Sequence, residues 1–374
     1  IIDEVPIGSA LEVGMAVDAA SSAFKKWSRT SPTERARILF NVSKIVRERR
    51  SELATLLTME QGKPLRESLR EISGFAYTCD YYAGMAGKLR GHQVPLSPKG
   101  RYGVIVRQPI GVCGAILPFN FPIGLMPWKV APALIAGNTI ILKPARTTPL
   151  TSLWCAEIFD EAGLPNGVLN VVTGYGEAVG EEILSSPWVR NISFTGETAT
   201  GRHVMEVASG QLKRITLELG GSDPMIVCDD ANLDLAADGA IMGRFLNCGQ
   251  TCTAVKRLYV FDKIAEEFVG KLVERVKQIK VGNGLNPETT MGPLNNPQQR
   301  EKLERQVEDS VSRGAKVVVG GARPLGPDFD KGFFYLPTIL TDIDESSTIV
   351  NEECFGPALP TFRVDDLDQA IEMA

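Results

Sequence analysis

The chain has 374 residues, of which 44% are hydrophobic and 23% are charged, and its formal net charge is -5. This length exceeds what one hydrophobic core usually serves, so we expect two or more domains. The composition is that of an ordinary folded globular protein, which excludes disorder and fibrous repeats. The slight acidic excess and the absence of a long basic stretch give nucleic-acid binding no support.

Cysteine and histidine usage narrows the class further. Seven cysteines form no C-x-x-C pair and lie mostly in apolar runs, which is typical of reduced intracellular thiols. Only His92 and His203 are present, which disfavours most metal sites and Cys-His or Ser-His catalytic pairs. The most apolar stretch, residues 123–142, is interrupted by prolines, a lysine and an asparagine, so it predicts buried elements rather than a membrane span. We expect a soluble cytoplasmic protein whose general base, if any, is a carboxylate.

The N-terminal ninety residues have helical periodicity. Apolar residues recur at helical spacing over 10–27 and 32–50, and Ser31 with Glu34 predicts a capping box at the start of the second helix. Residues 91–109 change to short alternating runs with prolines, which predicts a projecting β-hairpin. The first residue is not Met and the chain stops inside a helical pattern, so we expect a fragment of a longer protein.

After the hairpin, β-rich apolar runs alternate with helix-length segments, which predicts a parallel α/β sheet. The expected strands of this first series are residues 114–117, 139–143, 168–172 and 191–194. A second α/β series follows, with strands at 224–228, 257–261 and 316–319 and a helix at 264–280. The predicted fold class is therefore α/β, with a Rossmann-like parallel-sheet domain, a second α/β domain and the hairpin.

One loop has the form of a phosphate cradle. Gly196 ends a predicted strand and the next residues lead directly into a helix, which places free backbone N–H groups at a helix N-terminus. The spacing from Gly196 to Gly201 mimics a P-loop, but Arg202 and His203 stand where its Lys and its Ser or Thr should be. A nucleoside triphosphatase is therefore disfavoured.

Two other groups could bind phosphate, although each has a plainer interpretation. Gly174, Gly176 and Gly180 also lie between a strand and a helix, but their spacing differs from G-x-G-x-x-G, and an ordinary β-to-α turn explains it equally well. Lys143 and Arg146 follow a parallel strand at the edge where such sheets bind ligands. A solvated loop is the alternative for these two cations.

The residues that could perform chemistry are a cysteine and a glutamate. Cys252 is predicted in a loop, whereas Cys248 lies one helical turn earlier on an apolar face, so Cys252 is the better nucleophile candidate. Glu218 ends an apolar strand, where burial would raise its pKa and make it a usable base near neutral pH. A structural ion pair is the alternative for Glu218.

Four short motifs lie at residues 118–122 (PFNFP), 217–221 (LELGG), 249–252 (GQTC) and 353–357 (ECFGP). In their sequence and order they resemble the motifs of the aldehyde dehydrogenase superfamily. The resemblance spans essentially the whole chain and is greatest to the succinate-semialdehyde, lactaldehyde and glyceraldehyde branches. It implies a cofactor-binding domain at 1–90 and 110–218, an oligomerisation hairpin at 91–109, and a catalytic domain at 219–374 that lacks a C-terminal segment. It also implies a homodimer or homotetramer.

The resemblance implies a mechanism for these residues. Cys252 attacks the aldehyde carbon while the Asn120 side-chain amide and the Cys252 backbone N–H hold the oxyanion. Hydride then passes to a nicotinamide cofactor, and Glu218 deprotonates the water that hydrolyses the thioester. The product is a free carboxylic acid.

The resemblance also implies which residues contact the cofactor and the substrate. The cofactor residues are Lys143, Arg146, Gly176, Gly196, Glu197, Glu353, Phe355, Phe119 and Leu219. The resemblance implies that Gly196 and Glu197 lie beside the pyrophosphate and Gly176 near the adenosine half. It also implies that Lys143 faces the adenine ribose and that Glu353 holds the nicotinamide ribose. Family members that prefer NAD often carry Glu at the position of Arg146, so two cations there favour NADP over NAD. Glu197 departs from the more usual Ser, and nothing in the sequence explains it. The expected substrate-pocket residues are Trp128, Leu246 and Thr251.

Substrate choice is inferred from two of those positions. Succinate-semialdehyde enzymes place arginines where this chain has Trp128 and Leu246, so a distal carboxylate would lack its cationic partner. We therefore expect a small uncharged aldehyde such as glyceraldehyde or lactaldehyde. The alternatives are a succinate-semialdehyde dehydrogenase, a coenzyme-A-acylating relative, a catalytically silent nucleotide-binding protein, and a thiol hydrolase that uses Cys252.

Overall fold

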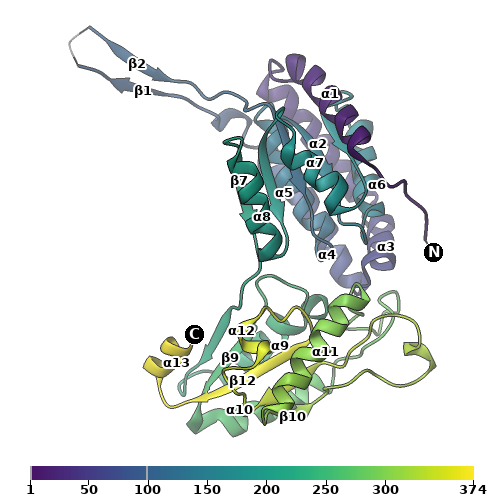
Figure 1. The fold of residues 1–374 in the computed structure, drawn as a ribbon, viewed down its shortest axis with the longest axis vertical. Helices are drawn as coiled ribbons and strands as arrows, with labels where there is room; N and C mark the ends of the chain where they lie inside the picture. The colour runs from purple at the N-terminus through teal and green to yellow at the C-terminus, as the bar shows by residue number, and fades with distance from the viewer. Residues whose placement is uncertain (1, 98–99) are drawn as a thin grey trace. The chain divides into compact units, whose positions relative to one another are not determined.

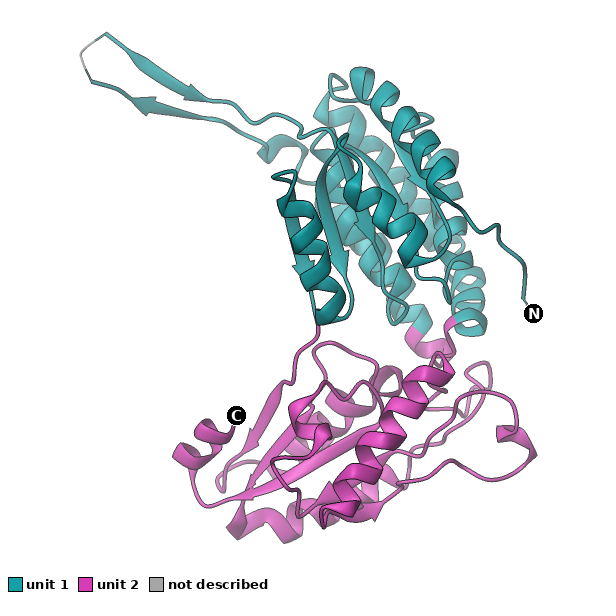
Figure 2. Ribbon diagram, viewed as in Figure 1, with its two compact units in different colours: residues 1–60, 68–219 teal, residues 61–67, 220–374 magenta. Residues whose placement is uncertain are grey.

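The computed structural model describes residues 2–97 and 100–374, and the chain divides into two compact units (Figure 2). Unit 1 comprises residues 1–60 and 68–219, and unit 2 comprises residues 61–67 and 220–374. This division groups residues 61–67 with unit 2 and groups Leu219 and the hairpin residues 91–109 with unit 1. The expected roles of the domains stay predictions.

Unit 1 begins with helices whose starts are encoded locally. The four helices are α1 (Ala10–Trp27), α2 (Pro32–Glu48), α3 (Arg50–Gln61) and α4 (Leu65–Ala83). The predicted capping box of α2 is present: the Ser31 hydroxyl accepts from the Glu34 N–H at 3.2 Å, and the Glu34 carboxylate accepts from the Ser31 N–H at 3.3 Å. Ser9 and Glu12 form the same arrangement at α1.

The sheet of unit 1 has five parallel strands in the order β5-β4-β3-β6-β7. The edge strand β7 is labelled in Figure 1. They are β3 (Val112–Ile116), β4 (Thr139–Lys143), β5 (Leu169–Val171), β6 (Val189–Thr195) and β7 (Arg214–Glu218). The connecting helices are α5 (Pro122–Ile135), α6 (Leu150–Glu161), α7 (Glu181–Ser185) and α8 (Thr198–Ser209). Every residue of β4 is buried, as expected for a parallel strand covered on both faces. The chain order reverses between β3 and β6, and ligands of open α/β sheets bind at the carboxyl ends of strands at such a point.

The predicted hairpin is a two-stranded antiparallel ribbon of β1 (His92–Pro95) and β2 (Tyr102–Ile105). Most of its side chains are exposed. Residues 98 and 99 of the predicted hairpin lie outside the described residues. Its role in oligomerisation stays a prediction.

Unit 2 is built on a second five-stranded sheet in the order β10-β11-β12-β9-β8. The strands β8 (Pro224–Val227), β9 (Arg257–Phe261), β12 (Ala358–Val364) and β11 (Thr338–Thr341) are parallel, and β10 (Lys316–Val319) is antiparallel to β11. The main helices are α9 (Leu233–Phe245), α10 (Asp262–Val276) and α11 (Pro297–Ser312). Two sheets of largely parallel strands with helical connections confirm the predicted α/β class. No helix in the part of the chain that the structure describes combines the length and hydropathy needed to cross a membrane.

Candidate active site

Asn120 lies at the predicted edge of the unit 1 sheet, in the turn between β3 and α5, and it is 5% exposed. The turn is anchored by Glu71 of α4. Its Oε1 accepts from the backbone N–H groups of Ile123 at 2.9 Å and Gly124 at 2.8 Å. A carboxylate that satisfies these first N–H groups stabilises the start of α5. The position of Asn120 is therefore set by a strand end on one side and a capped helix on the other.

Glu218 is the last residue of β7, and its placement corrects one expectation. We expected a buried carboxylate, but Glu218 is exposed, because β7 is an edge strand whose side chains alternate between partly buried and exposed. A cation nevertheless acts on it. Lys129 of α5 is buried, donates to the Ser193 hydroxyl at 3.0 Å, and has its pKa lowered to about 8 by burial, an effect that the negative charge of Glu218 opposes.

The loop from β6 into α8 has the features expected of a phosphate cradle. A Cβ atom on Gly196 would lie 2.6 Å from the Phe194 ring, so only glycine fits there. Within the described residues, the buried hydroxyl of Thr195 has no hydrogen-bond partner. Glu197 is the N-cap residue of α8, and its side chain makes no capping hydrogen bond. A backbone that can be approached closely, next to an unsatisfied hydroxyl, fits an anionic group of a nucleotide.

The two predicted cations lie at the carboxyl end of β4 and differ in environment: Lys143 is its last residue, and Arg146 follows three residues later. Lys143 is buried, its Nζ donates to the Pro144 carbonyl at 3.2 Å, and burial lowers its pKa against the opposing charge of Glu177. Arg146 is exposed, and its guanidinium carbon lies 5.1 Å from the centroid of the Tyr175 ring. A cavity of about 210 Å³ is lined by both Arg146 and Tyr175. Because Tyr175 directly precedes Gly176, the structure brings Arg146 close to the predicted adenosine-side glycine.

The other predicted site residues of unit 1, Trp128, Phe119 and Leu219, lie on different structural elements. Trp128 of α5 is 60% exposed, and Phe119 is half-buried in the turn after β3. Leu219 packs on Gly201 of α8, where an added Cβ would overlap its side chain. Leu219 therefore has a packing role in unit 1, whatever its relation to a cofactor.

In unit 2, the segment that precedes Cys252 has an unusual backbone. Asn247, Cys248 and Gly249 have φ values of 50°, 57° and 73°, all in the left-handed region. Only glycine adopts that region without strain. A Cβ on Gly249 would also overlap the carbonyl oxygen of Gly356, so both conformation and space require glycine at this position of the 249–252 motif.

Side chains from distant segments of unit 2 hold this loop. Glu67 Oε2 accepts from the Asn247 N–H at 3.0 Å. Gln250 is fully buried, donates through Nε2 to the Asn247 carbonyl at 3.0 Å, and accepts from the Asn295 N–H at 2.9 Å. These bonds offset the strain of the left-handed residues.

The two cysteines of the loop differ as predicted. Cys248 is 1% exposed, and burial, reinforced by the charge of Glu67, raises the pKa of its thiol. Cys252 is only partly buried. Its neighbour Thr251 has a buried hydroxyl without a partner among the described residues, and Leu246 is partly buried at the end of α9. Cys252 is therefore the more accessible thiol, and Cys248 is a core residue.

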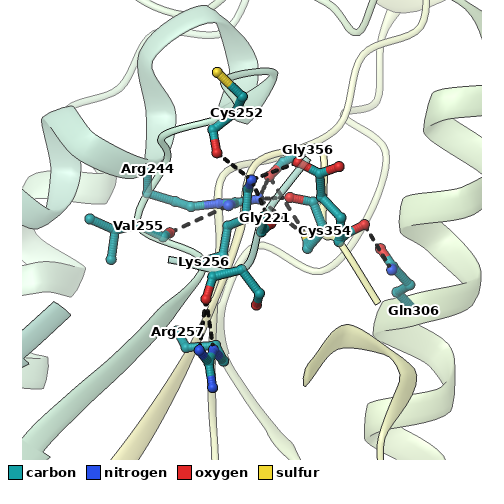
Figure 3. Close-up of polar contacts among 11 residues, drawn as sticks. Gly221, Arg244, Cys252, Val255, Lys256, Arg257, Gln306, Cys354 and Gly356 are labelled. Carbon is teal, nitrogen blue, oxygen red and sulfur yellow. Dashed lines mark hydrogen bonds and ion pairs between the residues drawn. The ribbon is translucent and has the colours of Figure 1, made fainter. Parts of the chain in front are cut away.

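The carbonyl oxygen of Cys252 accepts a hydrogen bond from a buried lysine, Lys256, which was not predicted from the sequence (Figure 3). Lys256 has no exposed surface, and its Nζ donates to the carbonyls of Cys252 at 2.7 Å and Gly221 at 2.8 Å and to Glu353 Oε1 at 2.6 Å. The available signal was a lysine between Val255 and Arg257, four residues after the candidate nucleophile. That signal is weak, because such a lysine usually reaches solvent.

Arg244 is a second buried cation that was missed, and it holds the 353–357 motif. It has no exposed surface and donates to the carbonyl oxygens of Val255, Cys354 and Gly356 (Figure 3). Phe355 lies between the last two of these anchor points. Arg244 therefore positions the segment that carries the predicted cofactor residues Glu353 and Phe355.

Comparison with protein families matches the whole chain. The family model described as "Aldehyde dehydrogenase family" matches residues 1–374. The betaine aldehyde dehydrogenase of Bacillus subtilis (strain 168) is 43% identical over 96% of this chain and 74% of its own length. The NADP(+) succinate-semialdehyde dehydrogenase of Escherichia coli (strain K12) is 42% identical over 100% of this chain and 77% of its own length.

Solved structures agree with this match. A crystal structure of an E. coli NADP-dependent enzyme has a TM-score of 0.96 and 42% identity, covering 99% of this chain and 76% of that one. A lactaldehyde dehydrogenase structure has a TM-score of 0.95 and 38% identity, covering 98% of this chain and 76% of that one. The chain spans about three quarters of the length of these relatives.

Proposed function

Because this chain belongs to the aldehyde dehydrogenase family and is thus an oxidoreductase acting on aldehydes, we propose that it oxidises a small uncharged aldehyde to a carboxylic acid, with NADP preferred over NAD. The observation that supports this most directly is the placement of Cys252. Its loop conformation is stabilised by hydrogen bonds, its thiol is partly buried, and its carbonyl is bound by a fully buried lysine.

Each of three residues takes one role in the proposed reaction. The Cys252 sulfur forms a covalent bond with the aldehyde carbon, and the Asn120 amide together with the Cys252 N–H donates to the resulting oxyanion. The nicotinamide cofactor supplies the hydride acceptor. Glu218 takes a proton from the water that cleaves the thioester. Its exposed position allows water to reach the carboxylate.

The residues of unit 1 fit a dinucleotide phosphate. The glycine at 196 and the unpartnered Thr195 hydroxyl would accommodate the pyrophosphate, and Lys143 would face the adenine ribose. Arg146 would bind a 2′-phosphate, because its guanidinium is exposed and is held beside the Tyr175 ring. These contacts support the preference for NADP.

The substrate assignment depends on apolar side chains at two positions. A carboxylate that loses its hydration needs a cationic partner, and neither Trp128 nor Leu246 offers one. The succinate-semialdehyde relative of E. coli favours a second candidate, succinate semialdehyde. The two candidates differ by a full negative charge at the end of the substrate that is not oxidised.

Initial rates of cofactor reduction by the full-length protein would test the assignment. We expect kcat/KM to be at least about tenfold higher for glyceraldehyde or lactaldehyde than for succinate semialdehyde, since a missing polar partner costs about 1–3 kcal/mol. The Arg146→Glu variant should reverse the ratio of NADP to NAD rates, because it replaces the proposed phosphate-binding cation with a carboxylate. A preference for succinate semialdehyde would contradict the substrate proposal, and an unchanged cofactor ratio would contradict the role of Arg146.

We also propose that the hairpin formed by β1 and β2 mediates assembly of a homodimer or homotetramer. Tyr102 is 72% exposed and Val104 is 63% exposed, which leaves apolar side chains on an antiparallel ribbon accessible to another copy. Sedimentation velocity of the full-length protein would measure its mass. A monomer at micromolar concentration would contradict this assignment.

A further inference from the structure

An ion pair in unit 2 joins the nucleophile segment to the 353–357 motif. The Lys256 side chain has no exposed surface, whereas the Glu353 side chain is 23% exposed. The ammonium is surrounded by three acceptors: Glu353 Oε1 at 2.6 Å and the carbonyls of Cys252 and Gly221. Three donors and three acceptors match, so the buried charge is fully satisfied.

A contribution to the folding stability of the protein does not explain well why Lys256 is buried. Desolvation of an ammonium costs several kcal/mol, and a buried ion pair is often no more stabilising than apolar side chains of similar volume. The path of the 353–357 segment is also held without Lys256. Gln306 Nε2 donates to the Glu353 carbonyl at 3.3 Å, and Arg244 binds the carbonyls of Cys354 and Gly356. Lys256 therefore acts on the carboxylate of Glu353 rather than on its backbone.

The carboxylate of Glu353 is confined on two sides. Oε1 is bound by Lys256, and Oε2 lies against Gly220, where an added Cβ would overlap it. A side chain bound at one oxygen and closely packed at the other has few rotamers left, so it is preorganised for a ligand.

We propose that Lys256 is a positioning residue that couples the cofactor-binding carboxylate of Glu353 to the nucleophile Cys252 through one shared ammonium. This inference rests on the proposed roles of Glu353 and Cys252. Lys256 fixes Glu353 for the hydroxyls of the nicotinamide ribose and neutralises its charge next to the nucleophile loop. The same ammonium holds the Cys252 carbonyl, so a change at Glu353 alters the electrostatic environment of Cys252.

The coupling predicts opposite effects from the two partners of the ion pair. Lys256→Met leaves the Glu353 charge without its cation, which disfavours a thiolate at Cys252. Glu353→Gln leaves the ammonium without its anion, which favours the thiolate. Because the thiolate is the reactive form, we expect alkylation of Cys252 to slow about threefold or more in Lys256→Met and to speed up by a similar factor in Glu353→Gln. The double variant should react at a rate near that of the wild type.

The measurement is the rate of iodoacetamide labelling of the Cys252 peptide in the full-length protein without cofactor, followed by mass spectrometry. Peptide-level detection separates Cys252 from the other partly buried thiol, Cys228. Equal rates in the wild type and both single variants would overturn the proposal. So would faster labelling in both single variants, because loosening of the fold accelerates labelling whichever partner is removed.

Cofactor affinity provides a second readout, by NADPH fluorescence titration. We expect Lys256→Met to raise the Kd for NADPH about tenfold and the double variant to bind within about twofold of Glu353→Gln, because coupled residues are not additive. If the fold-increases in the Kd for NADPH of the two single variants multiply in the double variant, the proposal is overturned. Should Lys256→Met fail to fold, Lys256→Gln replaces it, and the Glu353→Gln labelling rate remains decisive without any change at Lys256.

The matched control is Lys213→Met in unit 1. Lys213 Nζ also binds two backbone carbonyls, those of Ser186 and Val189, but it precedes β7 at the amino end of the strand, opposite the edge that carries the predicted cofactor residues. We expect labelling and NADPH binding within about twofold of the wild type for this variant. If Glu353→Gln leaves NADPH binding unchanged, the proposed ribose role of Glu353 fails, while the opposite labelling responses still decide the role of Lys256.

Discussion

The candidate catalytic residues of unit 1 and unit 2 are positioned in different ways. In unit 1, Glu218 is placed by the register of β7, and Asn120 lies in the turn between β3 and α5, where one capping side chain, Glu71, holds the start of the helix. In unit 2, Cys252 lies in a loop that is fixed by left-handed residues and by buried side chains such as Lys256 and Glu67. A residue at a strand end depends on regular local structure, whereas the loop depends on contacts from many distant segments. Substitutions around the Cys252 loop should therefore disturb more contacts within unit 2 than substitutions at a strand end disturb within unit 1.

The largest effect expected separates the two cysteines of that loop. Cys252→Ser should lower kcat on the order of 10³-fold or more, because the proposed covalent step is lost. Cys248→Ser should retain activity within about tenfold of the wild type, because a buried thiol with a raised pKa does no chemistry. The two variants are compared by their initial rates of cofactor reduction, each divided by the concentration of folded protein. Equal losses in the two variants would remove the distinction between nucleophile and core residue.

The next effect tests the strand-end placement of unit 1. Asn120→Ala should lower kcat by about 10²–10³, because loss of one oxyanion donor costs roughly 3 kcal/mol of barrier. Cofactor binding should change little, since the amide is proposed to act on the substrate oxygen. Single-turnover kinetics isolates the chemical step. A loss smaller than about tenfold would assign Asn120 a structural role in the turn before α5.

A third prediction concerns the backbone of the loop. Gly249→Ala should destabilise the protein by about 2–3 kcal/mol, because alanine is strained at a φ of 73° and its Cβ would overlap the Gly356 carbonyl. Gly270→Ala is the matched control. It lies within α10, where a Cβ meets no neighbouring atom within 4 Å, so alanine should stabilise the protein by about 0.5–1 kcal/mol. Urea denaturation measures both, and similar values for the two variants would contradict the steric account.

The smallest effect is the pH dependence that Lys129 contributes. Burial lowers the pKa of Lys129 to about 8, whereas an unfolded lysine titrates near 10.4, so between these values the unfolded chain binds more protons. Stability must therefore rise with pH across this window and fall as pH decreases through it. As the pH is raised from about 8 to about 10, we expect the melting temperature of the wild type to increase relative to that of Lys129→Met.

Much of the fold could be predicted from local pattern. The strands at 139–143, 257–261 and 316–319 have the predicted bounds, and the Ser31 capping box is present, because alternation and capping are properties of neighbouring residues. The exposure of Glu218 could not be predicted, because it depends on whether β7 is a central or an edge strand.

The sequence by itself determined the α/β class, because strand-like and helix-length segments alternate along it. It also determined the family and the candidate residues Cys252, Glu218 and Asn120, because each is identified by a motif of a few adjacent residues. Only the tertiary structure decided what surrounds them. Lys256 contacts residues 35 and 97 positions away in the chain, and no local pattern distinguishes it from a surface lysine. A buried charge is recognised by its partners, and those partners are adjacent only once the chain has folded.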